Sequence, residues 1–270
     1  MSESQITKRL INGAKILVNS TIKSLLFILL IISSSSSIGE ELKIAVAANF
    51  KTTAQKIADK FSQETSHNVT LISASSSALA TQIYHGAPYD LFLSADKERP
   101  QWLIENERAD ASSLTHYATG QLAFFTPKEK ITSVDELKTS IKSQIGKLAI
   151  ANPKFAPYGL SSLNFIEKIA VKNEVSSKLV TGNNVIQALQ FVTSGNAQSG
   201  FVSLSQLKEN NQPTHYFILP HHLYPPIKQY AVITNYGSEK TTSRAFLNFL
   251  ITQSKTTISN SGYLIGDSNE

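Results

Sequence analysis

The sequence predicts an α/β fold built of two open domains. Apolar runs of strand length alternate with segments of helical periodicity, and this alternation occurs twice, in residues 42–93 and again from residue 118 onward. Strands that alternate with helices favour a parallel sheet with helices on both faces. The chain of 270 residues is 41% hydrophobic, which suffices for two cores of ordinary size. In such domains ligands bind at the carboxyl ends of the strands.

Three strands and two helices are expected in the first series. The strands are residues 42–48 (LKIAVAA), 68–73 (NVTLIS) and 89–93 (YDLFL), each apolar or β-branched over a typical strand length. The first helix covers residues 51–64, where apolar residues recur at helical spacing: Ala54, Ile57, Ala58 and Phe61. The second, residues 77–85, is ended by a glycine and a proline.

The second series begins with strands at residues 118–126 and 147–151, then two helices and a further strand, at 158–171, 184–193 and 200–204. Prolines surround a candidate edge strand at residues 215–219, since proline interrupts the ladder of a central strand. A strand at residues 229–234 and an amphipathic helix at 242–252 follow. We therefore expect domain 1 to comprise residues 40–121 and 230–270, and domain 2 to comprise residues 122–229.

Residues 1–39 have the pattern of a secretory signal peptide. Four basic residues precede an unbroken apolar run at residues 25–32 (LLFILLII), which small residues follow up to Gly39. These eight apolar residues would rise about 12 Å as a helix, well short of a hydrocarbon core of about 30 Å. We expect cleavage near Gly39-Glu40 and an exported, soluble mature protein. An uncleaved anchor is the alternative, whereas a lipoprotein is excluded because the chain has no Cys to acylate.

The formal net charge of +5 belongs largely to this segment. The first 39 residues carry four basic side chains and one acidic one, so the remaining chain holds 21 basic and 19 acidic residues. Nucleic-acid binding requires Lys and Arg gathered on one face with aromatic residues between them, and the sequence has no such cluster. We expect no nucleic-acid partner. The absence of Cys also excludes disulfides, thiol nucleophiles and metal sites built on Cys.

None of the common catalytic motifs is present. The sequence lacks a G-x-S-x-G elbow, a G-x-x-x-x-G-K loop, a G-x-G-x-x-G turn and an H-E-x-x-H pair. His221 and His222 stand together in a proline-rich loop, where neighbouring rings rarely bind one ion, so we expect no protein-ligated metal. Asp90 and Asp96 flank a strand, and we expect them at the sheet edge and hinge. These observations favour a binding protein over an enzyme.

The positive signal lies at the starts of four predicted helices. Asn49 follows the first strand and Ser76, the middle of three consecutive serines, follows the second, 27 residues further on. Because this is the length of one βα unit, both lie at the same edge of one sheet. Residues 156–159 (APYG) and 182–185 (GNNV) repeat the arrangement in the second series. Free main-chain N–H groups and the positive end of the helix dipole make such an edge an anion site. Each start alone is more simply an ordinary cap, but their repetition in both halves favours binding.

At these residues the sequence resembles the periplasmic molybdate-binding proteins of bacterial ABC importers. The resemblance rests on residues 45–50 (AVAANF), 75–83 (SSSALATQI) and, most specifically, 86–96 (GAPYDLFLSAD). Asn152-Pro153, residues 156–159 and the stretch 185–205 also resemble the family, so the match covers residues 42–265. It implies a type II periplasmic binding protein fold, in which two α/β domains close on molybdate or tungstate in the cleft between them.

The resemblance also implies which residues bind the anion. Asn49 stands where the family has Ser or Asn after the first strand, and Ser76 stands at a hydroxyl ligand after the second. Tyr158 and Val185 stand at positions that donate main-chain N–H groups. Ala48, where some relatives have Thr, would contribute through its amide alone. Ser203 stands where some members have a Tyr ligand, so this sequence has no Tyr hydroxyl at that position.

The resemblance further implies an inner-membrane ABC permease as partner, a monomer in the periplasm, no cofactor and no catalysis. A receptor for another tetrahedral oxyanion, such as sulfate, stays open as an alternative. An exported α/β hydrolase that uses a Ser and one of the six His also stays open, although the missing elbow argues against it.

Overall fold

The computed structural model describes residues 40–209 and 215–266, which belong to one compact unit. The expected signal peptide, residues 1–39, and its cleavage site before Glu40 lie outside the described residues. Within the described ranges, no helix combines the length and apolar character that crossing a bilayer requires.

The first of two sheets has the strand order β2-β1-β3-β10-β4. Its strands are β1 (Glu41–Ala47), β2 (Asn68–Ala74), β3 (Leu91–Ser94), β4 (Thr115–Gly120) and β10 (Ile227–Ile233). β1 runs parallel to β2 and β3, whereas β10 is antiparallel to both β3 and β4. The prediction of a parallel sheet is therefore wrong for this strand. β10 enters from the far end of the chain and not through a βαβ crossover, which would impose a parallel direction.

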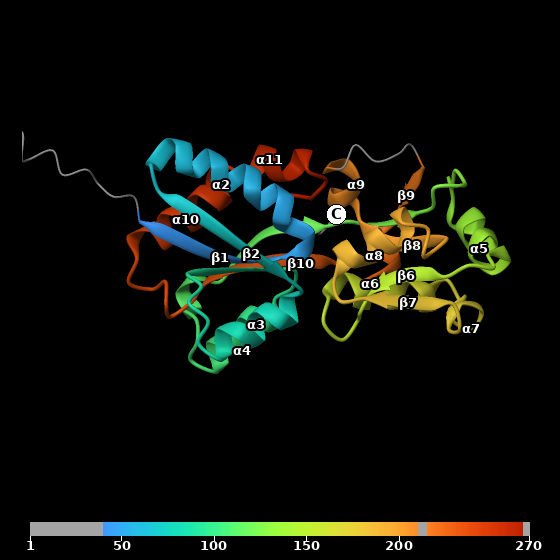
Figure 1. Ribbon diagram of the computed structural model, residues 1–270, viewed down its shortest axis with the longest axis horizontal. Coiled ribbons are helices and arrows are strands. Elements are labelled where there is room, and N and C mark those ends of the chain that lie inside the picture. The colour runs from blue at the N-terminus through green and yellow to red at the C-terminus, as the bar shows by residue number, and fades with distance from the viewer. Residues whose placement is uncertain (1–39, 210–214, 267–270) are drawn as a thin grey trace, which may run out of the picture. The chain divides into compact units, whose positions relative to one another are not determined.

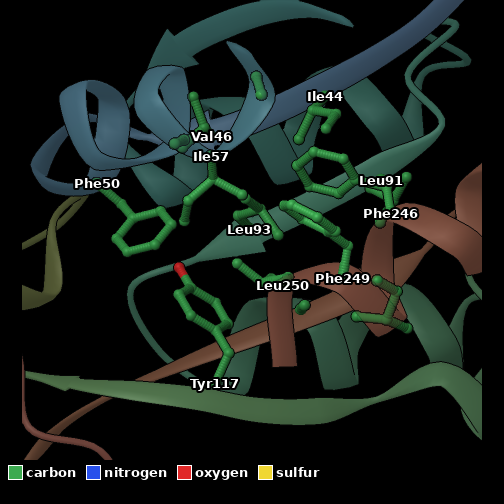
Figure 2. Packing of buried hydrophobic residues seen from close by; sticks show 14 of the residues in the cluster. Ile44, Val46, Phe50, Ile57, Leu91, Leu93, Tyr117, Phe246, Phe249 and Leu250 are labelled. Atoms are coloured by element: carbon green, nitrogen blue, oxygen red, sulfur yellow. The ribbon is translucent and has the colours of Figure 1, made fainter. Parts of the chain in front are cut away.

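Helices cover both faces of this sheet (Figure 1). One face carries α2 (Lys51–Thr65), α10 (Thr241–Thr252) and α11 (Lys255–Asn260), and the other carries α3 (Ser76–Tyr84) and α4 (Glu98–Glu105). Ile57 of α2 and Phe246 of α10 pack with Leu93 of the central strand in one buried cluster (Figure 2). We call this sheet with its helices the first lobe. The sequence does not predict α4, whose Pro100 occupies the first turn, where proline leaves no helical hydrogen bond unmade.

The second sheet has the order β7-β6-β8-β5-β9. Its strands are β5 (Leu122–Phe125), β6 (Leu148–Ala151), β7 (Leu179–Gly182), β8 (Ser199–Ser203) and β9 (Tyr216–Ile218), the last at an edge as its flanking prolines predict. β6 is parallel to β7 and β8, whereas β5 is antiparallel to β8 and β9, so this sheet is also mixed.

The helices of the second lobe are α5 (Val134–Ser143), α6 (Pro157–Lys168), α7 (Lys172–Val175), α8 (Val185–Thr193) and α9 (Leu204–Glu209). Phe124 of β5 packs with α5, α6 and α7, and the next residue, Phe125, packs with α8 and α9. Successive residues of a strand face opposite sides, so helices cover both faces here too. Short 3₁₀ turns lie at Ala48–Phe50 (η1), Ala111–Ser113 (η2) and His221–Leu223 (η3).

The two lobes meet where two strands that are consecutive in the chain, β4 and β5, belong to different sheets. Residues 118–126 are predicted as one strand, but Gly120 ends β4 and Leu122 begins β5 in the other sheet. Gly120 leaves room for a residue of the second lobe: a Cβ there would lie 2.1 Å from the hydroxyl oxygen of Tyr158. The C-terminal segment lies at the same junction, because Leu264 pairs with Thr119 in an antiparallel bridge. The expected domain limits stay a prediction.

Candidate functional site

A small cavity lies between the starts of four helical segments, two from each lobe. Its volume is about 10 Å³. This is room for about one water molecule. The lining residues are Ala47, Ala48, Asn49, Ser75, Ser76, Ala95, Ala156, Pro157, Tyr158, Asn184 and Val185. The five residues expected to bind the anion, Ala48, Asn49, Ser76, Tyr158 and Val185, are therefore brought together around one space.

Ser76 is the first residue of α3 and is fully buried. The preceding residue, Ser75, caps the helix by accepting the N–H of Ala78 at 3.4 Å. Ser76 does not cap. Its hydroxyl oxygen accepts the main-chain N–H of Ala95 at 3.0 Å. Because a hydroxyl has one donor as well as its acceptor sites, the proton of Ser76 is left to donate to a ligand.

Tyr158 and Val185 supply donors from the second lobe. Val185 is the first residue of α8 and Tyr158 the second of α6, so neither N–H has an acceptor inside its helix. In the part of the chain that the structure describes, neither N–H donates to another oxygen. Asn184 caps α8 by accepting the N–H of Gln187 at 3.1 Å. Two helix starts thus direct unpaired donors and the positive ends of their dipoles at the cavity.

The side chain of Asn49 is occupied elsewhere. Its amide nitrogen donates to Oε1 of Gln229 at 2.9 Å and to the hydroxyl of Tyr263 at 3.2 Å. The main-chain carbonyl oxygen of Asn49 accepts from the hydroxyl of Tyr263 at 2.7 Å and from the hydroxyl of Ser205 at 3.1 Å. The residue lies in η1 and makes no side-chain cap to α2. What Asn49 has left for a ligand is its main-chain N–H, and the same holds for Ala48, whose side chain is a methyl group.

The phenol of Tyr158 lies at the junction of the two lobes. The ring is buried, its hydroxyl lies against Gly120 of the first lobe, and that oxygen has no partner among the described residues. Burial raises the pKa of the Tyr158 phenol well above its ordinary value, and the nearby Tyr263, Tyr224 and Tyr117 add to this effect. The phenol is therefore uncharged at physiological pH.

Ser203 and both aspartates lie apart from the cavity. Ser203 is fully buried and contacts the side chains of Ser205 and Gln206 at 3.1 and 3.0 Å. Asp90, also fully buried, accepts the N–H of Lys43 at 2.6 Å and pairs with Lys240 at 2.8 Å, at the amino end of β3.

Asp96 pairs with Arg99 at 2.6 Å. Its burial raises the pKa of this carboxyl, against the opposing effect of the guanidinium. Asp96 also accepts the N–H of Arg99 at 3.0 Å, in the first turn of α4. Both aspartates therefore have structural partners that do not involve the cavity.

The cavity wall carries no Lys, Arg, His, Asp or Glu. Two larger clefts adjoin it, of about 420 Å³ and 350 Å³. The larger shares Ala95 and Pro157 with the cavity and the smaller shares Ala48. Charged residues such as Lys97 and Lys51 line these clefts, so charge is kept outside the inner space. Within residues 40–209 and 215–266, no three His, Asp or Glu side chains gather closely enough to hold a metal ion.

Three residues of this region are missed by sequence reasoning: Ser205, Gln229 and Tyr263. They bond to Asn49 from 156, 180 and 214 positions away in the chain. Their flanking residues carry no motif that pairs them with Asn49, and the chain must fold before they meet.

Comparison with known proteins identifies the family. The molybdate-binding protein ModA of Rhodobacter capsulatus is 39% identical over 214 residues, which cover 78% of this chain and 83% of that protein. The solved periplasmic molybdate-binding protein of Azotobacter vinelandii superposes with a TM-score of 0.78 at 31% identity, over 84% of this chain and all of that one. The sulfate-binding protein SubI of Mycobacterium tuberculosis, at 12% identity and a TM-score of 0.69 over 85% and 88% of the two chains, shares the fold alone. Residues 42–264 match the family described as bacterial extracellular solute-binding proteins. The chain belongs to that family and has the type II periplasmic binding protein fold, with two lobes and a cleft between them.

Proposed function

We propose that this protein captures molybdate in the periplasm and delivers it to an ABC importer in the inner membrane, and that it binds tungstate as well. The relatives that share 31–39% of its sequence are named for molybdate binding. The observation that carries the proposal is the convergence of the Ser76 hydroxyl with the unpaired N–H groups of Tyr158 and Val185 on one uncharged cavity.

The donor set suits a fully deprotonated tetrahedral anion. Such an anion offers only acceptors, and every free polar group identified around the cavity is a donor. Protonated phosphate carries an O–H that needs an acceptor, so a site of donors alone discriminates against it. Neutral donors at helix starts also spread the anion's charge over the dipoles, and release breaks no salt bridge.

In this proposal Ser76 binds through its hydroxyl, whereas Asn49, Tyr158 and Val185 bind through their main-chain N–H groups. Ala48 is an additional main-chain donor. No residue has a catalytic role and no cofactor or protein-ligated metal takes part. An anion of four oxygens exceeds the space of one water molecule, so we expect the lining helix starts to shift outward around it while the lobes stay in contact.

The remaining parts of the proposal concern processing and assembly. Residues 1–39 act as a signal peptide, cleaved near Gly39-Glu40, and the mature protein is a periplasmic monomer. Its domains are residues 40–121 with 230–270, and residues 122–229. An inner-membrane ABC permease is the partner.

Two alternatives, a sulfate receptor and a hydrolase, are each separated from the proposal by a different property. A sulfate receptor would use the same donors, so only the preference among anions separates it from a molybdate receptor. A hydrolase that used Ser76 would need a base beside the hydroxyl, and no histidine is among the residues that line the cavity.

Calorimetry on the chain from Glu40 onward tests the proposal. The protein is titrated with molybdate, tungstate, sulfate and phosphate under identical conditions, and generic esters are supplied in a parallel assay. We expect molybdate and tungstate to bind at least tenfold more tightly than sulfate or phosphate, with no ester turnover. Tighter binding of sulfate, or hydrolysis of the ester, would overturn the proposal in favour of the corresponding alternative.

A further inference from the structure

Tyr263 reaches the junction of the lobes from the C-terminal segment that follows α11. This segment is fixed at two points: the main chains of Leu264 and Thr119 exchange hydrogen bonds of 2.9 Å, and the side chain of Gln121 donates to the carbonyl of Gly262 at 3.0 Å. Between these points Tyr263 is buried, with 2% of its surface exposed. Its ring stands edge-on to that of Phe50, with 5.1 Å between the ring centroids. The phenol is therefore held rigidly beside η1.

The hydroxyl of Tyr263 contacts both the main chain and the side chain of Asn49. It donates to the main-chain carbonyl of Asn49 at 2.7 Å and accepts from its side-chain nitrogen at 3.2 Å. Burial raises the pKa of this phenol far above its ordinary value, so it stays a donor at every physiological pH. With both its carbonyl and its amide group engaged, Asn49 has a fixed main chain where it lines the anion cavity.

The same hydroxyl joins Asn49 to the second lobe. It lies 2.9 Å from Oγ of Ser205, in the first turn of α9, and Ser205 itself donates to the carbonyl of Asn49 at 3.1 Å. Ser205 is in turn within 3.1 Å of Ser203 at the end of β8. A continuous buried chain of polar groups thus runs from the cavity wall of the first lobe to a strand of the second.

We propose that Tyr263 is a positioning residue for anion binding, which holds the main chain of Asn49 in the cavity and couples it to the second lobe through Ser205. This inference rests on the proposed function. Parting the lobes would pull Ser205 away from the hydroxyl of Tyr263 and from the carbonyl of Asn49, and losing these two buried hydrogen bonds is costly. The contacts therefore favour the arrangement in which the four helix starts converge, and they slow the escape of a bound anion.

The test is Tyr263→Phe, with Tyr117→Phe as the matched control. Tyr117 is also buried and its ring packs on the same Phe50, at 4.9 Å (Figure 2). Its hydroxyl, however, donates to first-lobe acceptors alone among the described residues: the carbonyl of Ser94 at 3.4 Å and Oε1 of Gln229 at 3.5 Å. Molybdate affinity is measured by calorimetry and the molybdate dissociation rate by stopped flow, each on protein shown to be folded by circular dichroism. Ser205→Ala and the double variant Tyr263→Phe/Ser205→Ala complete a double-mutant cycle, which measures the coupling between the two hydroxyls.

We expect Tyr263→Phe to weaken molybdate binding about tenfold, mainly through faster dissociation, and Tyr117→Phe to change it less than about twofold. Ser205→Ala should weaken binding as well, and the double variant should lose less than the product of the two single effects. Equal effects of Tyr263→Phe and Tyr117→Phe would overturn the inference while leaving the proposed function intact. If Tyr263→Phe does not fold, native binding by Ser205→Ala overturns it instead. Absence of oxyanion binding by the wild-type protein would refute the proposed function and this inference together.

Discussion

The hydroxyl oxygen of Ser76 accepts a hydrogen bond from the main-chain N–H of Ala95 at 3.0 Å. This bond links the start of α3 to the end of β3, two segments of the same lobe that both line the cavity. Since the oxygen is already an acceptor for Ala95, the hydroxyl is oriented as a donor before any ligand arrives. Ser77, the next residue, is used differently: its N–H donates across the cleft to the carbonyl of Phe155 at 3.3 Å and its hydroxyl accepts from Arg99 at 3.1 Å.

Ser76→Ala should weaken molybdate binding strongly and leave the fold nearly intact. The variant loses one hydrogen bond to a charged acceptor, worth about 1.5–3 kcal/mol, so the dissociation constant should rise about 10- to 150-fold. Ser77→Ala is the control, because its hydroxyl is turned to Arg99, and its affinity should stay within about twofold. Calorimetry on both variants decides, and an unchanged dissociation constant for Ser76→Ala removes this residue from the site.

Val185→Pro should lose anion affinity without unfolding the protein. Proline lacks the N–H that faces the cavity, yet position 185 opens α8, where the ring and its fixed φ are tolerated. Asn184 before it is extended, with φ −151° and ψ 178°, which suits a residue that precedes proline. We expect at least a tenfold loss of affinity, with a thermal midpoint close to that of Val185→Ala.

Val185→Ala is the matched control for this prediction. It removes most of the same buried side chain, at a cost of about 1–2 kcal/mol of stability, and keeps the N–H. Its affinity should be nearly native. Should both variants bind like the wild type, Val185 belongs to the core alone and the second lobe's share of the site is assigned incorrectly.

Gly159→Ala should destabilise the protein, although alanine is the better helix former by about 1 kcal/mol. A Cβ at this position would lie 2.1 Å from the carbonyl oxygen of Ala151, so α6 approaches β6 as closely as it does only because residue 159 has no side chain. We expect a net loss of about 1–3 kcal/mol in urea unfolding. Leu160→Ala, exposed on the same turn, should change stability much less. A more stable Gly159→Ala protein would contradict this close packing.

Glu209→Gln should raise the thermal midpoint at pH 7 and have no effect in acid. Burial raises the pKa of Glu209 above its ordinary value of 4.5, against the opposing hydrogen bond from Thr53 at 2.8 Å. A carboxyl whose pKa is higher in the folded state lowers stability above that pKa, and the penalty vanishes as the pH falls below 4.5. Glutamine keeps an acceptor for Thr53 without the charge.

The measurement for Glu209 is differential scanning calorimetry of the variant and the wild type between about pH 4 and pH 7, the range over which the carboxyl takes up its proton. The advantage of Glu209→Gln over the wild type should shrink steadily as the pH is lowered. Glu129→Gln, on an exposed residue, should show no such trend. A pH-independent difference for Glu209→Gln would show that its charge is not the cause.

The sequence predicts the main elements of the first lobe to within a few residues. The apolar run at residues 42–48 and the helical spacing in residues 51–64 correspond to β1 and α2, because local periodicity reports which face of each element is buried. Elements whose pattern is short or interrupted, such as α7 and β7, are not predicted, and the run at residues 118–126 hides a change of sheet at Gly120. Periodicity predicts which residues are buried, but it does not predict to which sheet a strand belongs.

The same division holds for the site. Asn49 and Ser76 are proposed as ligands from the sequence, because a strand end and the helix that follows it are neighbours in the chain and chain order alone puts them at one sheet edge. The structure places both residues in the wall of the same cavity. Only the tertiary structure decides that Asn49 turns its side chain to Gln229 and Tyr263, since these contacts span 180 and 214 residues and form when the lobes meet. The sequence thus determined the units and the positions of the donors, because both follow from local order. The tertiary structure decided which of their atoms are free to bind, because a hydrogen bond is assigned by what packing brings within reach.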